Sequence, residues 1–174
     1  LLNRTMPLHI EDPPKFRRIV EEASRKYAGE VEISLTGRVL THVAFLESWL
    51  PFSTTSYPLV RVPHVNYLSS MWTDTGGSAL NRARVGETVY VSLSMENPAR
   101  VHSIWENVTA TIYREGSERP IQTTQRTLGV AAGSKATYVF SFSPREPGTY
   151  YYTLDAPGGF TVTGSTPRLE VETG

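Results

Sequence analysis

The feature that most constrains this chain is a series of short segments, from Val65 to Val171, in which apolar and polar residues alternate. A period of two places the apolar side chains on one face of a β-strand and the polar side chains on the other. Turn sequences such as Asp74-Thr75-Gly76-Gly77 and Pro147-Gly148 separate the segments. About seven or eight short strands without intervening helices predict an immunoglobulin-like antiparallel β-sandwich.

The residues before the sandwich begin with a predicted helix. Asp12 is a good N-cap, Pro13 sits at the first helical position, and Gly29 follows the expected end. One face of this helix is apolar and the other is charged with both signs, which is typical of a solvated outer face. The apolar positions are Phe16, Ile19, Val20, Ala23 and Tyr27.

A long strand is expected after the helix, because apolar residues occupy most odd positions from Val31 to Phe45. Its length predicts a bulge or bend, which we place at Gly37. We expect the segment from Leu46 to Ser56 to be an irregular, partly apolar turn that contains Trp49, Leu50, Pro51 and Phe52.

Two prolines between Tyr57 and His64 predict an extended connector or edge strand, and we place the domain boundary near Pro63. The predicted organisation is therefore a helix-and-strand unit over residues 1–63 and the β-sandwich over residues 64–174. The fold class is mainly β, with a small α+β unit in front of the sandwich.

The composition excludes several functional classes. The 17 basic and 17 acidic residues give no net charge, which argues against a nucleic-acid binder and against a polybasic membrane patch. The chain has no Cys, which excludes disulfides, thiol catalysis and Cys-ligated metals. Fourteen of the basic residues are Arg and three are Lys; we interpret this first as genome composition and second as an indication of a hot-environment source.

The N-terminal residue is Leu1 rather than Met, and no charged-then-apolar leader follows it. No segment approaches the roughly 20 apolar residues of a membrane-spanning helix. We therefore expect that a leader or anchor was removed or that the chain is an excised fragment. Any membrane association is expected only through a segment upstream of Leu1.

Residues 85–99, "VGETVYVSLSMENPA", and residues 128–155, "LGVAAGSKATYVFSFSPREPGTYYYTLD", resemble the CARDB-type and related immunoglobulin-like repeats of archaeal and bacterial cell-surface proteins. The resemblance covers residues from about 65 to 172. It implies adhesion, display or spacing outside the cytoplasm, and it supplies no catalytic residues.

A second resemblance concerns residues 7–60, where an amphipathic helix precedes a "VEISLTGRVL" strand and an apolar "PF". This order is similar to the closing half of an LEA14/WHy-type β-sandwich. The opening half of that sandwich is absent from this sequence. It is expected either upstream of Leu1 or to be replaced by packing of the helix-and-strand unit on the second domain.

The common catalytic and metal-binding patterns are missing from the sequence. There is no GxSxG elbow, phosphate-binding glycine loop or HExxH motif, and the four histidines are not at metal-ligand spacing: His9, His42, His64 and His102. We interpret His9, beside Glu11 and Asp12, as a strand-end histidine near a helix cap, and Asp74 as a turn residue rather than a Ca²⁺ ligand. Acidic pairs that are distant in sequence stay an open alternative. We predict no enzyme, no catalytic residue, no metal and no cofactor.

Exposed aromatic residues are the candidate contacts for a partner or a sugar. Trp105 lies among polar residues in "VHSIWENVT", and the run Tyr150-Tyr151-Tyr152 places rings on both faces of one strand. We name Trp105 and Tyr151, since an exposed ring can stack on a sugar or anchor a protein interface. The alternative is that Trp49, Trp72 and most tyrosines belong to the core or to a domain junction.

Two Asn-X-Thr sequons, at Asn3 and Asn107, are candidate glycosylation sites if the chain is exported. They agree with an extracytoplasmic location at the cell surface or in the secreted fraction.

Three functions follow from these observations. The preferred one is a non-catalytic structural or binding module whose partners are other envelope or surface proteins, including further copies of itself. The second is a subunit of a surface polymer that completes a neighbour's sheet with the segment Leu1–Ile10. The third is the accessory carbohydrate-binding domain of a larger hydrolase.

Overall fold

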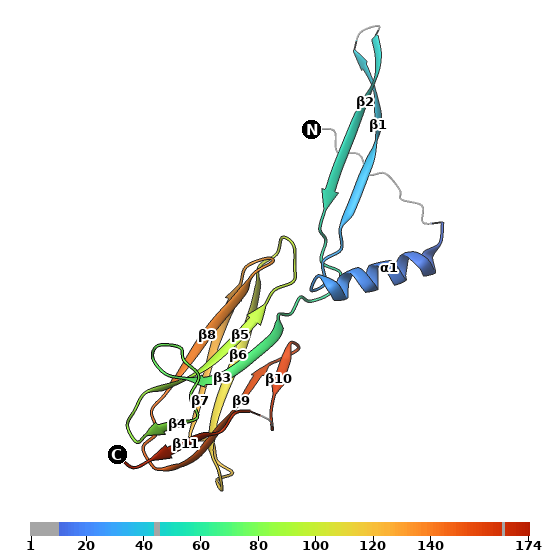
Figure 1. The fold of residues 1–174 in the computed structure, drawn as a ribbon. Helices are drawn as coiled ribbons and strands as arrows, with labels where there is room; N and C mark the ends of the chain where they lie inside the picture. Colours follow the sequence, from blue (N-terminus) through green and yellow to red (C-terminus); the bar gives the residue numbers. More distant parts are fainter. Residues whose placement is uncertain (1–10, 44–45, 165) are drawn as a thin grey trace. The chain divides into compact units, whose positions relative to one another are not determined.

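A computed structural model describes residues 11–43, 46–164 and 166–174 of the chain (Figure 1). The chain divides into two units, Leu1–Val62 and Pro63–Gly174. Over the described residues the fold is mainly β, with one helix in the first unit and an immunoglobulin-like antiparallel β-sandwich as the second. This is the predicted fold class.

Helix α1 spans Pro13–Lys26 in the first unit and begins as the sequence predicts. The side chain of Asp12 accepts a hydrogen bond from the backbone N–H of Lys15 at 2.9 Å, which satisfies one of the free donors at the helix start. Beyond the helix, Ala28 and Gly29 have φ angles of 51° and 92°, and this left-handed pair turns the chain out of the helix.

The remainder of the first unit is a β-hairpin of strands β1 (Ile33–Val43) and β2 (Leu46–Ser56), paired from Ile33 with Ser56 to Val43 with Leu46. The prediction of an irregular turn over Leu46–Ser56 was wrong. Pro51 suggested a break, but in a two-stranded sheet each strand has one solvent-facing edge, where a missing N–H costs no ladder hydrogen bond.

Gly37 is not a bulge either, because it pairs directly with Phe52 in an uninterrupted ladder. A Cβ at residue 37 would lie 2.7 Å from the Phe52 ring. Glycine is therefore needed here for the close approach of an aromatic ring, and the strand continues through it without a break.

The described residues of the first unit bury little apolar surface. Phe16 and Ile19 of the predicted apolar helix face are 41% and 54% exposed, and Trp49 and Leu50 of the hairpin are 61% and 52% exposed. The buried residues cluster where the helix ends, and the connector joins them there: the backbone N–H of Val31 donates to the carbonyl oxygen of Pro58 at 3.0 Å.

The second unit is a sandwich of two sheets. The three-stranded sheet has the order β3-β5-β8, and the six-stranded sheet has the order β4-β11-β9-β6-β7 with β10 attached to β9. All pairs are antiparallel except β11 with β4, which are parallel. The strands are β3 Asn66–Thr73, β4 Arg82–Arg84, β5 Val89–Glu96, β6 Ile104–Arg114, β7 Gln122–Val130, β8 Lys135–Phe142, β9 Gly148–Ala156, β10 Phe160–Val162 and β11 Leu169–Glu172.

The inward faces of the two sheets form the core, as the alternation predicts. In β5, Val89, Val91, Leu93 and Met95 are all 0% exposed. Aromatic rings from both sheets meet around Trp72, whose ring lies 6.0 Å from that of Phe142 and 5.2 Å from that of Tyr152. Core formation therefore uses one face of each strand and leaves the other face to solvent.

Tyr150 fixes the loop between β8 and β9. Its hydroxyl donates a hydrogen bond to the backbone carbonyl of Glu146 at 2.8 Å, four residues upstream. A tyrosine near the start of a strand that bonds back to the preceding loop in this way is the tyrosine corner of immunoglobulin-like sandwiches.

Asn97 organises the loop between β5 and β6. It is 0% exposed, its Nδ2 donates to the carbonyl oxygens of His102 and Val130 at 2.9 Å each, and its Oδ1 accepts from the N–H of Ala99. A single side chain thus satisfies three backbone groups, two of them in buried contacts, and sets the position at which β6 begins.

We expect Tyr150→Phe to lower the free energy of unfolding by about 1 kcal/mol, because the Glu146 carbonyl loses its donor while the ring packing is kept. Tyr151→Phe, one residue away on the opposite face of the strand, is the matched control and should change stability by less than about 0.5 kcal/mol. Denaturant unfolding monitored by far-UV circular dichroism measures both. Equal effects of the two substitutions would contradict a tyrosine corner.

High pH tests the burial of Tyr152. Burial raises the pKa of Tyr152 from 10.0 to about 12, a rise that its hydrogen bond with Ser70 opposes and that Tyr67 reinforces. The unfolded chain therefore ionises first, so the stability contributed by Tyr152 is complete below pH 10 and is lost as the pH rises towards 12. Denaturation midpoints between these values should fall less steeply for Tyr152→Phe than for the unmodified chain, and parallel curves would refute this prediction.

Candidate binding face

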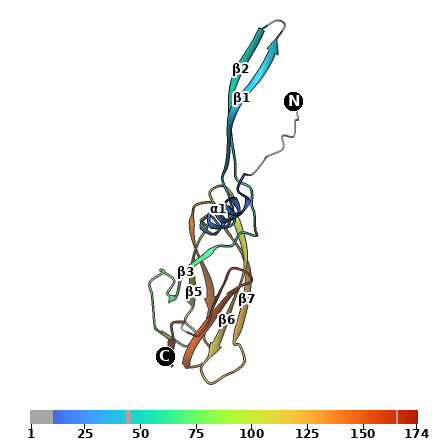
Figure 2. The same cartoon turned by 90° about the vertical axis from the view of Figure 1, so that its right-hand side faces the viewer.

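The outer face of the six-stranded sheet is the candidate site, because its strands present aromatic and polar side chains in register. In β6, the even residues from Ile104 to Ile112 are buried, and the odd residues from Trp105 to Tyr113 are exposed or half-buried. The same alternation holds for the middle of β9. Figure 2 shows β6 and β7 side by side, and paired residues of adjacent strands point to the same side of a sheet.

The register arranges these outward residues in rows. At the ends of β6 are the rows Trp105 with Gly129 and Tyr113 with Tyr151. Between them lies a set of shorter polar side chains that we call the polar strip: Asn107 with Thr127, Thr109 with Gln125 and Asp155, and Thr111 with Thr123 and Thr153.

Trp105 is 71% exposed although it stands within a strand. A Cβ at Gly129 would come within 2.6 to 2.9 Å of three atoms of the six-membered ring of the indole. The ring therefore covers the glycine of the neighbouring strand and keeps its other side open to solvent. Any larger residue at position 129 would displace the ring.

Tyr151 is held in a stack at the other end of the face. Its ring lies 5.2 Å from the Tyr113 ring at an interplanar angle of 14°, and the guanidinium carbon of Arg168 lies 4.6 Å from the Tyr151 ring centre. This geometry combines an aromatic stack with a cation–π contact. Tyr151 is half-buried, so it contributes an edge of the face rather than an open platform like Trp105.

The structure brings together three of the four residues that the sequence singled out. Trp105, Asn107 and Tyr151 lie on one face of one sheet. Asn107 is exposed, and its Oδ1 accepts a hydrogen bond from the Thr127 hydroxyl at 2.7 Å. Asn3 lies outside the described residues, as do His9 and the segment Leu1–Ile10.

Sequence reasoning missed Gly129 and the polar strip. The signal for the strip was present, since the outward positions of β6 and β7 read Asn-Thr-Thr and Thr-Gln-Thr. It was overlooked because threonine is common in any strand. Gly129 had no local signal, because its role depends on the pairing of β7 with β6.

A buried acidic side chain was also missed. Glu106 occupies an inward position of β6 and is 5% exposed, and its Oε1 lies 2.8 Å from Nδ1 of His64 and accepts from the N–H of Val65 at 3.3 Å. The sequence did contain a signal for it, because Glu106 occupies one of the positions of β6 at which the alternation predicts a buried side chain. Its partners belong to the start of the sandwich, so the contact fixes where the domain begins.

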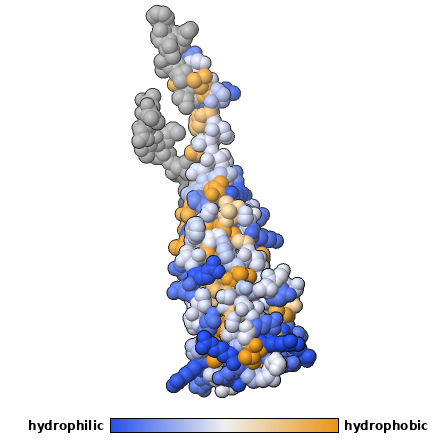
Figure 3. Space-filling view, turned by 90° about the vertical axis from the view of Figure 1, so that its left-hand side faces the viewer, coloured by the Kyte–Doolittle hydropathy of each residue, from blue (hydrophilic) through white to orange (hydrophobic). Residues whose placement is uncertain are grey.

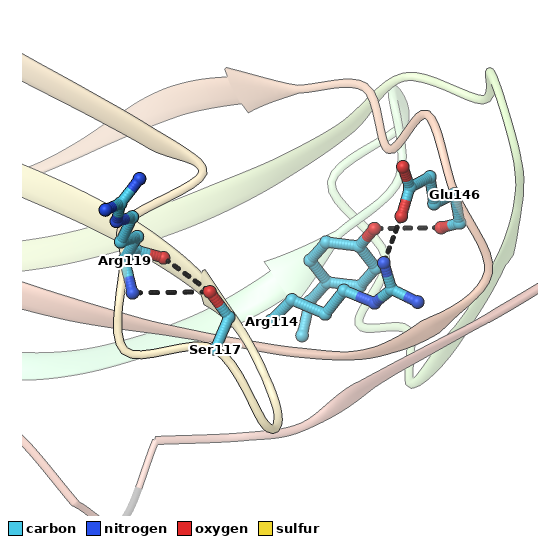
Figure 4. Close-up of polar contacts among 5 residues, drawn as sticks. Arg114, Ser117, Arg119 and Glu146 are labelled. Carbon is cyan, nitrogen blue, oxygen red and sulfur yellow. Dashed lines mark hydrogen bonds and ion pairs between the residues drawn. The ribbon is translucent and has the colours of Figure 1, made fainter.

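An open pocket of about 780 Å³ lies among the ends of β6 and β8, the start of β7 and the β8–β9 loop. Figure 4 shows polar contacts beside it: Arg114 forms an ion pair with Glu146, whose carbonyl accepts from Tyr150. In the adjacent turn, outside the pocket lining, Ser117 and Arg119 bond to each other. Figure 3 shows hydrophilic residues gathered at the end of the sandwich where the chain terminates. These pairs brace loops and are already engaged with one another.

Asp74 serves the turn in which the sequence places it. Its Oδ1 accepts from the N–H of Ser78 at 2.9 Å, and its carbonyl accepts from the N–H of Gly77. Within residues 11–43, 46–164 and 166–174, no three His, Cys, Asp or Glu side chains lie together in a group that could hold a metal ion.

Comparisons with known proteins give little. No family model and no curated protein matches the chain. Among solved structures, the Pseudomonas fluorescens alkylpurine DNA glycosylase AlkC is similar over 64% of this chain and 31% of its own, with 15% identity and a TM-score of 0.45. A Listeria innocua β-glucosidase is similar over 77% of this chain and 19% of its own, with 15% identity and a TM-score of 0.41. This chain spans less than a third of either protein, and these TM-scores carry no conclusion about it.

In the described part of the chain, no helix is both long and apolar enough to cross a bilayer.

Proposed function

We propose that this chain is a non-catalytic, extracytoplasmic binding module that acts in adhesion, display or envelope assembly, with its ligand on the outer face of β6, β7 and β9. The observation that carries the proposal is Trp105, a 71% exposed indole on a strand, which covers a glycine in the neighbouring strand. The partners we propose are other envelope or surface molecules, including further copies of the chain.

The physical case rests on the cost of exposing a tryptophan. A large apolar ring gains free energy when it leaves water, and tryptophan is enriched among the residues that dominate binding energy. The fold gains little from Trp105 where it stands, since the inward residues of β6, such as Ile104 and Val108, form the core. A ring that is held on a rigid strand also loses little freedom on binding.

The edge strands β7 and β8 are covered by side chains, which makes the outer face a better ligand site than strand addition at these two edges. Gln122 donates to the backbone carbonyl of Ser141 at 2.9 Å, Arg126 donates to that of Val139 at 3.0 Å, and Tyr138 donates to that of Gly129. Side chains from each sheet thus occupy edge carbonyls of the other. An edge covered in this way is a poor template for an incoming strand.

The resemblance to surface repeats supports the extracytoplasmic location. The strand-complementation alternative depends on Leu1–Ile10, which lie outside the described residues. It stays a hypothesis for a separate experiment with a chain that lacks those ten residues.

Trp105→Ala should weaken binding of the full chain to the cell-envelope fraction of its source organism by about tenfold or more, the effect expected of a central aromatic contact. Co-sedimentation at increasing protein concentration measures the apparent affinity. Gly129→Ala should weaken binding in the same direction, because the added Cβ displaces the Trp105 ring.

Trp49→Ala is the matched control, since Trp49 is 61% exposed but belongs to the hairpin of the first unit. It should leave co-sedimentation unchanged. Circular dichroism and unfolding midpoints confirm that each variant is folded. An envelope fraction that binds none of the proteins, or binds Trp105→Ala as well as the unmodified chain, would exclude the proposed site.

A further inference from the structure

We infer that the ligand of this face is a neutral glycan chain that lies along β6 between Trp105 and Tyr113. The inference rests on the proposed function and names its ligand class. It is carried by the polar strip between the two aromatic rows, whose chemistry differs from that of a protein-binding or an anion-binding surface.

The charge of the polar strip disfavours an acidic ligand. None of its eight side chains is basic: Asn107, Thr109, Thr111, Thr123, Gln125, Thr127, Thr153 and Asp155. The strip has one carboxylate, that of Asp155, which accepts a hydrogen bond from the Thr161 hydroxyl at 2.7 Å. Arg168, beside Tyr151, lies over that ring and outside the strip. A phosphate or uronate would meet no cation along the strip and one negative charge.

The hydrogen-bonding capacity of the strip fits hydroxyl groups. Five of the eight side chains are threonines, and a hydroxyl both donates and accepts, as do the amides of Asn107 and Gln125. A sugar hydroxyl has the same dual character and can pair with any of them in either sense. The apolar core of a protein interface would instead leave this row of polar groups unpaired, at a cost in free energy.

The aromatic rows provide a sugar-ring contact at each end of the strip. Trp105 offers one open side of an indole, and its six-membered ring is held in place above Gly129. Tyr113 lies eight residues further along β6, about 26 Å away at the usual rise of a strand. The side chains between them are all smaller than the two end rings. An extended oligosaccharide can therefore lie over the strip with an aromatic contact at each end.

Asn107 stands inside the strip, so its two proposed uses exclude one another. A glycan attached to Asn107 would cover the row that it shares with Thr127. The test therefore uses the full chain produced in a host without N-glycosylation, in which Asn107 is free to contact a ligand.

Affinity electrophoresis in gels that contain a soluble polysaccharide tests the ligand class. The probes are neutral hydroxyethyl cellulose, galactomannan and β-1,3-glucan, with polygalacturonate and alginate as acidic counterparts. We expect at least one neutral polymer to retard the chain and the acidic polymers to retard it less. Trp105→Ala should raise the dissociation constant for that polymer, obtained from mobility at increasing polymer concentration, by about tenfold or more.

Thr111→Val separates a glycan from a protein ligand, because it removes the middle hydroxyl of the row Thr123, Thr111 and Thr153 and keeps a β-branched shape. A glycan should bind about two- to tenfold more weakly, as for the loss of one neutral hydrogen bond. Thr137→Val in β8, on the three-stranded sheet, is the matched control and should bind normally.

The outcomes separate the two proposals. If the chain binds the envelope fraction through Trp105 but is retarded by no neutral polymer, the binding module stands and the glycan inference fails. Stronger retardation by an acidic polymer, or equal or tighter binding by Thr111→Val, also overturns the inference. If neither the envelope fraction nor any polymer binds, the proposed function fails and the inference fails with it.

Discussion

Buried aromatic contacts join the two sheets of the sandwich, and in the foremost of them the edge of one ring meets the face of the other, Trp72 of β3 against Tyr152 of β9. Both residues are 0% exposed, and their ring centres lie 5.2 Å apart at 78°. The polar tip of each ring has a partner, since the Trp72 N–H donates to the Pro167 carbonyl and the Tyr152 hydroxyl donates to Ser70. Large aromatic residues are thus buried without unpaired polar atoms. Because the inward side chains form the core that holds the sheets together, the outward side chains of β6, β7 and β9 are not needed for packing and can contact a ligand.

The sequence predicted those parts of the structure that depend on local periodicity. Alternation identified the core positions of β5, and the cap at Asp12 and the exposure of Trp105 followed from neighbouring residues. The relation of Trp105 to Gly129 was not predictable, because it requires the register of β6 against β7. The register likewise decides that Thr111, Thr123 and Thr153 form one row. A binding face made of three strands therefore becomes visible only when the pairing is known.

The first unit shows the limit of periodicity. Alternation in β1 predicts a strand with one covered face, yet Ile33 and Leu35 are 38% and 40% exposed. The alternation predicts which side chains of a strand tend to be buried. It does not predict which other part of the chain packs against them, because that depends on the tertiary structure. A two-stranded hairpin is marginally stable in water without such a cover. Pro51 misled the prediction of β2 for a related reason: whether a proline is tolerated depends on which edge of a strand is free, and this is not a local property.

The central claim is that the outer face of the six-stranded sheet binds the ligand. The most direct measurement is a map of backbone amide chemical shifts of the full chain, recorded by NMR during titration with the soluble fraction of its source envelope. The account predicts that the perturbed amides lie in β6, β7 and β9, and that the Trp105 indole N–H shifts with them. Shifts confined to the three-stranded sheet or to α1 and the hairpin would contradict it.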